Sequence, residues 1–228
     1  HVHSDVDEVL DFLRWTREKV GSDGYIFLHN SATPSFIGEN LADLVYLGEH
    51  TDPSIPLPGR MSPDMEFVPI VPRNGIIYGP WRTDEEGVLA HALEGWPVTA
   101  SISTTKPTAD DFTLNLYKAL SGLGLDRYEF LRAGEKPVGT GNENVYASIY
   151  YRSNDAVIFC ANIGEKKARA ILKPDFPRIG WSRKGMIEIE LGGRKKIYST
   201  EEISKKGIPL SLPQDSYALL KLAKYKTR

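Results

Sequence analysis

The sequence predicts an α/β region followed by an all-β region. Three observations support this fold class. Residues 1–134 alternate between helical and strand-like patterns, a polar, glycine-rich segment follows at 134–144, and nearly every later apolar run is short and β-rich. We therefore place a domain boundary at this segment, with the α/β region at 1–134 and an antiparallel β-sandwich at 135–228.

The first three expected elements are a helix and two buried strands. Apolar residues recur at helical spacing through 4–21, between a capping serine, Ser4, and the terminating Gly21. The runs "GYIFLH" at 24–29 and "DLVYL" at 43–47 are continuous and apolar, as is typical of strands buried on both faces. The proline-rich stretch 52–82 predicts a long functional loop with a short helix or strand inside it.

Two further helices enclose a third strand. Residues 83–96 match a capping box, with Thr83 and Glu86, and carry an apolar face. The run "PVTASIS" at 97–103 predicts a strand, and 108–124 predicts a helix capped by Thr108. This alternation is typical of a parallel sheet, in which a crossover element separates consecutive strands.

The second region predicts a sandwich of about seven strands. Its β-rich runs are separated by turn residues such as Gly192 and Gly193. The expected strands are "VYASIYYR", "DAVIFCANI", "KARAILKP", "MIEIEL", "KKIYS", "GIPLSL" and "SYALLKLAKY".

Composition and motifs exclude several classes of function. Hydrophobic residues make up 41% of the 228 positions and the net charge is −2, which favours a globular protein without a basic surface for nucleic acid. No apolar run is long enough to cross a bilayer, so we expect no membrane partner. Nucleotide-binding, serine-hydrolase and zinc motifs are missing, so we expect no cofactor and no metal. The single Cys160 predicts a buried thiol and leaves the compartment open.

The order of the two regions resembles the C-terminal layout of (β/α)8-barrel glycoside hydrolases, including α-galactosidase-like and α-amylase-like enzymes. The stretches that carry the resemblance are "DGYIFLHNS" and "LADLVYLGEH" as barrel strands, then "YASIYYRSNDAVIFCANIGEKKA" and "LPQDSYALLKL" as the sandwich. A barrel needs eight strands and about 250 residues, whereas residues 1–134 offer three or four strands. The resemblance therefore implies a partial TIM-type barrel segment, completed by an upstream part of the same polypeptide or by an oligomeric partner. A shorter open sheet is the competing interpretation.

Glu49 is the best candidate for a catalytic residue. It follows the strand 43–47, and reactive side chains of parallel barrels lie just beyond the C-terminal ends of strands. Glycosidic bond hydrolysis needs two carboxyl groups, one protonated and one ionised, and partial burial at such a place raises a carboxyl pKa toward that of a general acid. The alternative is that Glu49 only begins a solvated loop.

For the second carboxylate, Glu39 and Asp43 flank the start of the strand, and Asp43 is expected to lie toward the wrong face. Asp64 and Glu66 lie in the long loop, where nothing fixes their direction. We therefore expect the second carboxylate upstream of His1.

The other candidates would bind the sugar. Imidazole, amide and carboxylate groups hydrogen-bond hydroxyls, an arginine in the long loop binds a carboxylate or hydroxyl, and aromatic rings in "YGPWR" stack on sugar faces. The candidates are His29, Asn30, His50, Asp52, Arg60, Tyr78 and Trp81. The sequence thus predicts a glycosidase acting on a carbohydrate substrate. The alternative is a carbohydrate-binding or interaction protein without catalysis.

Overall fold

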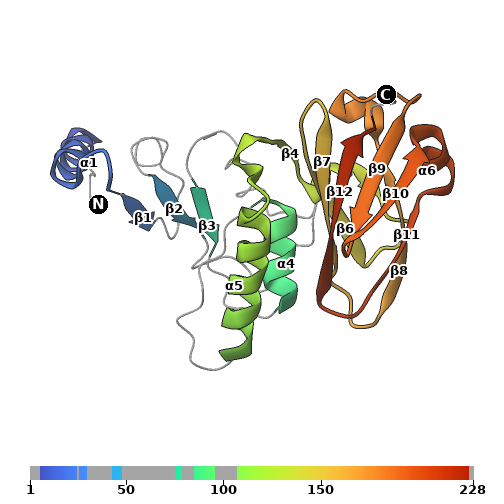
Figure 1. Ribbon diagram of the computed structural model, residues 1–228. Helices are drawn as coiled ribbons and strands as arrows, with labels where there is room; N and C mark the ends of the chain where they lie inside the picture. Colours follow the sequence, from blue (N-terminus) through green and yellow to red (C-terminus); the bar gives the residue numbers. More distant parts are fainter. Residues whose placement is uncertain are drawn as a thin grey trace.

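The computed structural model describes residues 6–24, 26–29, 43–47, 75–78, 85–95 and 107–225. Among the helices of these ranges, none combines the length and the apolar character that crossing a membrane would require. The chain forms a small parallel sheet with three helices and, beyond it, an antiparallel sandwich (Figure 1).

The α/β region contains the helix and the two strands expected at its start. Strands β1, β2 and β3 pair in parallel, in the order β1-β2-β3. Strand β3 lies in the proline-rich stretch, where a short element was expected. The elements are α1 (Val6–Val20), β1 (Phe27–His29), β2 (Leu44–Leu47), β3 (Gly75–Tyr78), α4 (Glu85–Leu93) and α5 (Pro107–Ser121).

The strand expected at 97–103 lies outside the described residues. Tyr78, which we expected in a loop, is the last residue of β3. The run "GIIY" forms a strand because it contains two β-branched isoleucines and an aromatic residue, which favour β-structure. The predicted α/β character is confirmed as a parallel three-stranded sheet with helices. A barrel segment is not evident in the described residues.

The predicted antiparallel β-sandwich is confirmed, and all seven expected strands form. The large sheet has the order β10-β9-β12-β7-β6-β4, and the small sheet has the order β11-β8-β5. Strand β4 pairs with β6, so the large sheet begins before residue 135. The strands are β4 (Glu129–Leu131), β5 (Val138–Gly139), β6 (Val145–Tyr151), β7 (Asp155–Asn162), β8 (Ala168–Pro174), β9 (Met186–Leu191), β10 (Arg194–Ser199), β11 (Ile208–Leu212) and β12 (Ser216–Lys224).

The burial pattern of each strand follows its place in the sandwich. In β8, buried and exposed residues alternate strictly, because one face packs on the core and the other faces solvent. In β7, every residue after Asp155 is buried, because this central strand is covered on both faces. The continuous apolar run of "AVIFCAN" therefore encodes a strand in the middle layer.

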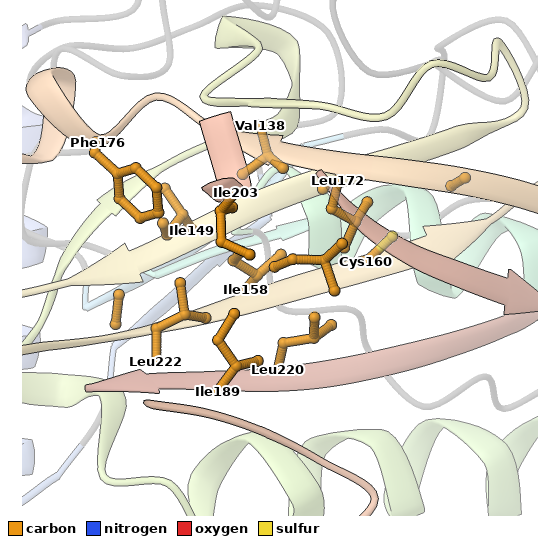
Figure 2. Packing of buried hydrophobic residues seen from close by; sticks show 14 of the residues in the cluster. Val138, Ile149, Ile158, Cys160, Leu172, Phe176, Ile189, Ile203, Leu220 and Leu222 are labelled. Atoms are coloured by element: carbon orange, nitrogen blue, oxygen red, sulfur yellow. The ribbon is translucent and has the colours of Figure 1, made fainter. Parts of the chain in front are cut away.

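Two hydrophobic clusters flank the large sheet. One lies between the two sheets and includes Ile158, Leu172 and Phe176, each fully buried (Figure 2). The other lies between the large sheet and helices α4 and α5, and includes Phe159 and Leu116. The sandwich and these helices therefore form three layers, with the large sheet in the middle.

A short helix, α6 (Thr200–Lys206), follows β10 and was not expected. Ser199 caps it by accepting a hydrogen bond from the backbone N–H of Glu202 (3.0 Å), and Gly207 ends it. Ile203 anchors α6 in the cluster between the sheets (Figure 2).

Candidate functional site

The C-terminal edge of the parallel sheet is the candidate site. His29 of β1 pairs with Tyr46 of β2, and Leu47 of β2 pairs with Tyr78 of β3. The three strands therefore end within about one residue of one another. Because they are parallel, the chain leaves all three at the same edge, which is where parallel sheets place their functional groups.

Two of the predicted site residues belong to the described strands. His29 and Tyr78 are the last residues of β1 and β3, and their backbone is described. The proposed catalytic residue Glu49 is two positions beyond the end of β2 in the sequence and lies outside the described residues. The remaining candidates also lie outside the described residues: Asn30, His50, Asp52, Arg60 and Trp81. Their roles remain predictions.

The opposite edge of the sheet is fixed by Asp43. Its carboxylate accepts a hydrogen bond from the backbone N–H of Ile26 (2.7 Å) and pairs with the guanidinium of Arg17, which also donates to the carbonyl of Gly24 (3.1 Å). These contacts join α1 to the starts of β1 and β2. They also lower the pKa of Asp43, chiefly through the Ile26 N–H and then through Arg17. Asp43 is thus a structural anchor away from the C-terminal edge.

Glu94 is a buried carboxylate that sequence reasoning missed. It follows α4, its residue is 5% exposed, and its Oε1 accepts a hydrogen bond from the backbone N–H of Gly134 (2.8 Å). Its Oε2 has no hydrogen-bond partner among the described residues and lies 3.9 Å from Nε of Arg132. Burial raises the pKa of Glu94, against the lowering effects of Gly134 and Arg132.

Glu135 belongs to the same group of polar contacts between the end of α4 and the sandwich, which we call the polar joint and which consists of Glu94, Arg132, Gly134, Glu135 and Arg178. It accepts a hydrogen bond from the backbone N–H of Arg132 (3.1 Å) and pairs with Arg178 (3.1 Å) of the turn that follows β8. The segment 132–135 is therefore attached on one side to α4 and on the other to the sandwich. No local pattern in the sequence marks Glu94, because its partners lie about 40 positions away.

The other described residues offer neither a reactive thiol nor a cluster of metal-binding side chains. Cys160 is a fully buried thiol whose pKa burial raises to about 12, as expected for an inert core cysteine. Within the described ranges, no three His, Cys, Asp or Glu side chains gather in a way that could hold a metal ion.

Comparisons with known proteins give a likeness in fold. No protein-family model matches the chain, and no curated protein matches it in sequence. A solved maltogenic α-amylase from Thermotoga neapolitana superposes with a TM-score of 0.57 at 12% identity, covering 95% of this chain and 59% of that one. AmyP in complex with maltose gives 0.53 at 11% identity, with coverages of 95% and 61%. An α-amylase from Geobacillus thermoleovorans, complexed with acarbose, gives 0.51 at 9% identity, with coverages of 97% and 64%.

These values establish a shared fold only. The chain spans about three fifths of the length of the solved structures it matches. The match covers nearly the whole chain, so it includes both the α/β region and the sandwich. The order of the two regions is thus the one seen in part of these glycoside hydrolases.

Proposed function

We propose that this chain is the C-terminal portion of a glycoside-hydrolase-like protein, with part of a (β/α)-barrel at 1–134 and a β-sandwich at 135–228. One observation carries the proposal most directly. Three parallel strands end together at one edge, and the predicted polar residues lie at or just after those ends in the sequence. The shared fold with α-amylases supports the same assignment.

In this proposal, Glu49 works as the acid or the base in the cleavage of a glycosidic bond. A protonated Glu49 donates to the oxygen of the leaving group, or an ionised Glu49 takes a proton from the attacking water. We place the opposite carboxylate in sequence upstream of this chain; Asp43 is unsuited to the role, because Ile26 and Arg17 hold it at the N-terminal ends of the strands. The separation of the two carboxyl groups then sets retention or inversion.

The binding residues would hold the sugar around this acid. His29, Asn30, His50 and Asp52 would hydrogen-bond hydroxyl groups, and Arg60 would bind a further oxygen. Tyr78 and Trp81 would stack on the apolar faces of the rings. Of the similar structures, AmyP is in complex with maltose and the Geobacillus thermoleovorans α-amylase with acarbose, so α-linked glucose oligomers are the first substrates to test.

The missing barrel elements would come from an upstream part of the same polypeptide or from an oligomeric partner. Among the described strands, β1 is the outermost of the sheet on one side, and an unpaired strand favours pairing with a further strand. Phe12 and Trp15 of α1 are 62% and 54% exposed, and their rings stack with centroids 6.2 Å apart. Exposed aromatic pairs of this kind support a further contact on this side of the molecule.

The test is the substitution Glu49→Gln in the intact protein. We expect it to lower the hydrolysis of aryl α-glucosides by at least about a hundredfold, as loss of a general acid or base typically does, while maltooligosaccharide binding is retained. If Glu49 is the acid, phenyl glucoside will lose more rate than dinitrophenyl glucoside, whose leaving group needs no proton. Glu143→Gln makes the same chemical change at an exposed sandwich position and serves as the control.

Three outcomes would count against the proposal. Equal rates for the two substitutions would remove Glu49 from the mechanism. Oligosaccharide binding by an intact protein without any hydrolysis would favour the alternative, a carbohydrate-binding protein that lacks catalysis. If neither hydrolysis nor binding is found, the glycoside-hydrolase assignment fails as a whole.

A further inference from the structure

The charges of this chain are divided unevenly between its two regions. Residues 135–228 contain 18 Lys or Arg and 10 Asp or Glu, for a net charge of +8. Residues 1–134 contain 10 and 20, for a net charge of −10, so the whole-chain value of −2 conceals the difference. A net charge of this size gives the basic region a positive surface field, which attracts anions.

Many cations of the sandwich are already paired with acids. Lys195 binds Glu188 (2.7 Å) in the large sheet, and on α6 both Lys205 and Lys206 bind glutamates one turn away. These pairs reduce the positive field on α6 and around Lys195. On β10, the exposed Arg194 and Lys196 form no ion pair within the described residues, but the neighbouring strand β9 carries the acids Glu188 and Glu190.

The outward side of β8 differs from these surfaces. Its inward residues are buried, whereas Arg169, Ile171 and Lys173 face solvent, and the exposed Lys167 directly precedes the strand. Alternate residues of a strand are about 7 Å apart, so these side chains form one row. Within the described residues, no ion pair involves Lys167, Arg169 or Lys173. We call this row the cationic face.

The strands beside β8 add no negative charge, and the nearest acids along the chain are the exposed Glu165 and Asp175, two residues beyond the two ends of the row. The exposed residues of β11 are Pro209 and Ser211, which pair with Ile171 and Arg169, and on the other side Gly139 of β5 pairs with Lys173. Ile171 is 49% exposed in the centre of the row, so no described element covers it. Strands β8 and β11 lie on the side of the sandwich away from α4 and α5 (Figure 1).

We propose that the cationic face is a docking surface for an acidic polysaccharide, a chain of sugars that bear carboxylate or sulfate groups. The cations Lys167, Arg169 and Lys173, which form no ion pair within the described residues, complement a polymer that carries anions along its length. The choice of a polysaccharide among polyanions rests on the proposed carbohydrate function. The face has no aromatic side chain on which nucleic acid bases could stack, and its single apolar side chain, Ile171, is too little for insertion into a lipid surface.

The experiment measures binding of polygalacturonate to the full chain at 50 and 200 mM NaCl. The double substitution Arg169→Gln and Lys173→Gln removes two charges from the face and preserves much of the side-chain length. Lys205→Gln with Lys206→Gln removes the same charge from cations that are already paired, and is the matched control. A cation near an anionic surface strengthens binding about fivefold. We therefore expect about a 25-fold loss for the first variant and less than about twofold for the control.

Several results would overturn the inference. These are equal losses in the two double variants, no binding by the unsubstituted chain at 50 mM NaCl, or binding that does not weaken at 200 mM NaCl. Tighter binding to an oligothymidylate or to phosphatidylserine vesicles than to polygalacturonate would assign the face to another class of partner. Binding requires no hydrolysis, so it is read independently of the Glu49→Gln experiment, and either proposal can fail while the other stands.

Discussion

Glu94 offers the sharpest prediction about stability, because two substitutions separate its roles. Its Oε1 accepts the hydrogen bond of the Gly134 N–H, and its charge is buried close to Arg132. Glu94→Gln keeps an acceptor oxygen at the same place and removes the charge. Glu94→Ala removes both.

The structure sets the magnitudes. In Glu94→Ala the Gly134 N–H loses its acceptor, which costs about 1–3 kcal/mol, and the lost packing brings the total to about 2–4 kcal/mol. In Glu94→Gln the lost attraction to Arg132, at 3.9 Å, is offset by relief of the desolvation of the buried charge. We expect this variant to lie within about 1 kcal/mol of the unsubstituted protein at pH 7.

The contribution of Glu94 to stability should decrease as the pH rises. Burial raises the pKa of Glu94 above its ordinary value of 4.5, so the native state binds this proton more tightly than the unfolded state. The stability contributed by Glu94 is therefore fully present below pH 4.5 and is lost as the pH rises through the raised pKa. Glutamine does not titrate, so Glu94→Gln gains stability relative to the unsubstituted protein as the pH rises.

The measurement is urea unfolding of the three proteins at several values between pH 4 and pH 8. A Glu94→Gln variant as unstable as Glu94→Ala at pH 7 would refute the reasoning, because the charge itself would then stabilise the joint. The direction of the pKa shift would be refuted if the difference in unfolding free energy between Glu94→Gln and the unsubstituted protein stayed constant with pH.

Three further predictions concern other parts of the fold. Asn162 is fully buried and its amide donates to the carbonyls of Lys166, Leu212 and Pro213, so Asn162→Ala should lower the unfolding free energy in urea by about 2–4 kcal/mol. Cys160 should not react with a thiol reagent at pH 8 until urea unfolds the sandwich, because burial raises its pKa to about 12; reaction at the rate of a free thiol would contradict this. Asp43→Asn should cost about 1 kcal/mol at pH 7, reduced by partial exposure. That cost should shrink as the pH falls below 3.8, since a lowered pKa gives stability that protonation removes.

Much of the sandwich could be predicted because its strands carry their pattern locally. In β8 the alternation of buried and exposed residues is visible in the letters themselves, and the unbroken apolar run of β7 marks a central strand. Strands β4 and β5 are only three and two residues long, too short for any period to be read. Their pairing is decided by the neighbouring strands β6 and β8.

The sequence contains a start and a stop pattern for helix α6, but the strand patterns on both sides made this helix hard to predict. Ser199 and Glu202 have the spacing of a capping box, and Gly207 ends the helix, but the flanking runs both predict strands. At the candidate site, the sequence predicted strands β1 and β2. The register of this pair places the C-terminal ends of the two strands side by side. The burial of Glu94 could not be predicted, since it depends on a contact with Gly134 in another layer.

Helix α4 connects the two regions in the described structure. Its residues Val88, Leu89, Ala90, Ala92 and Leu93 are each at most 3% exposed, so it is buried on nearly all sides. A helix that is apolar all round cannot be a surface element. It packs on the large sheet, and Glu94 at its end holds the segment that leads into β5. The sandwich therefore completes the hydrophobic core that contains α4.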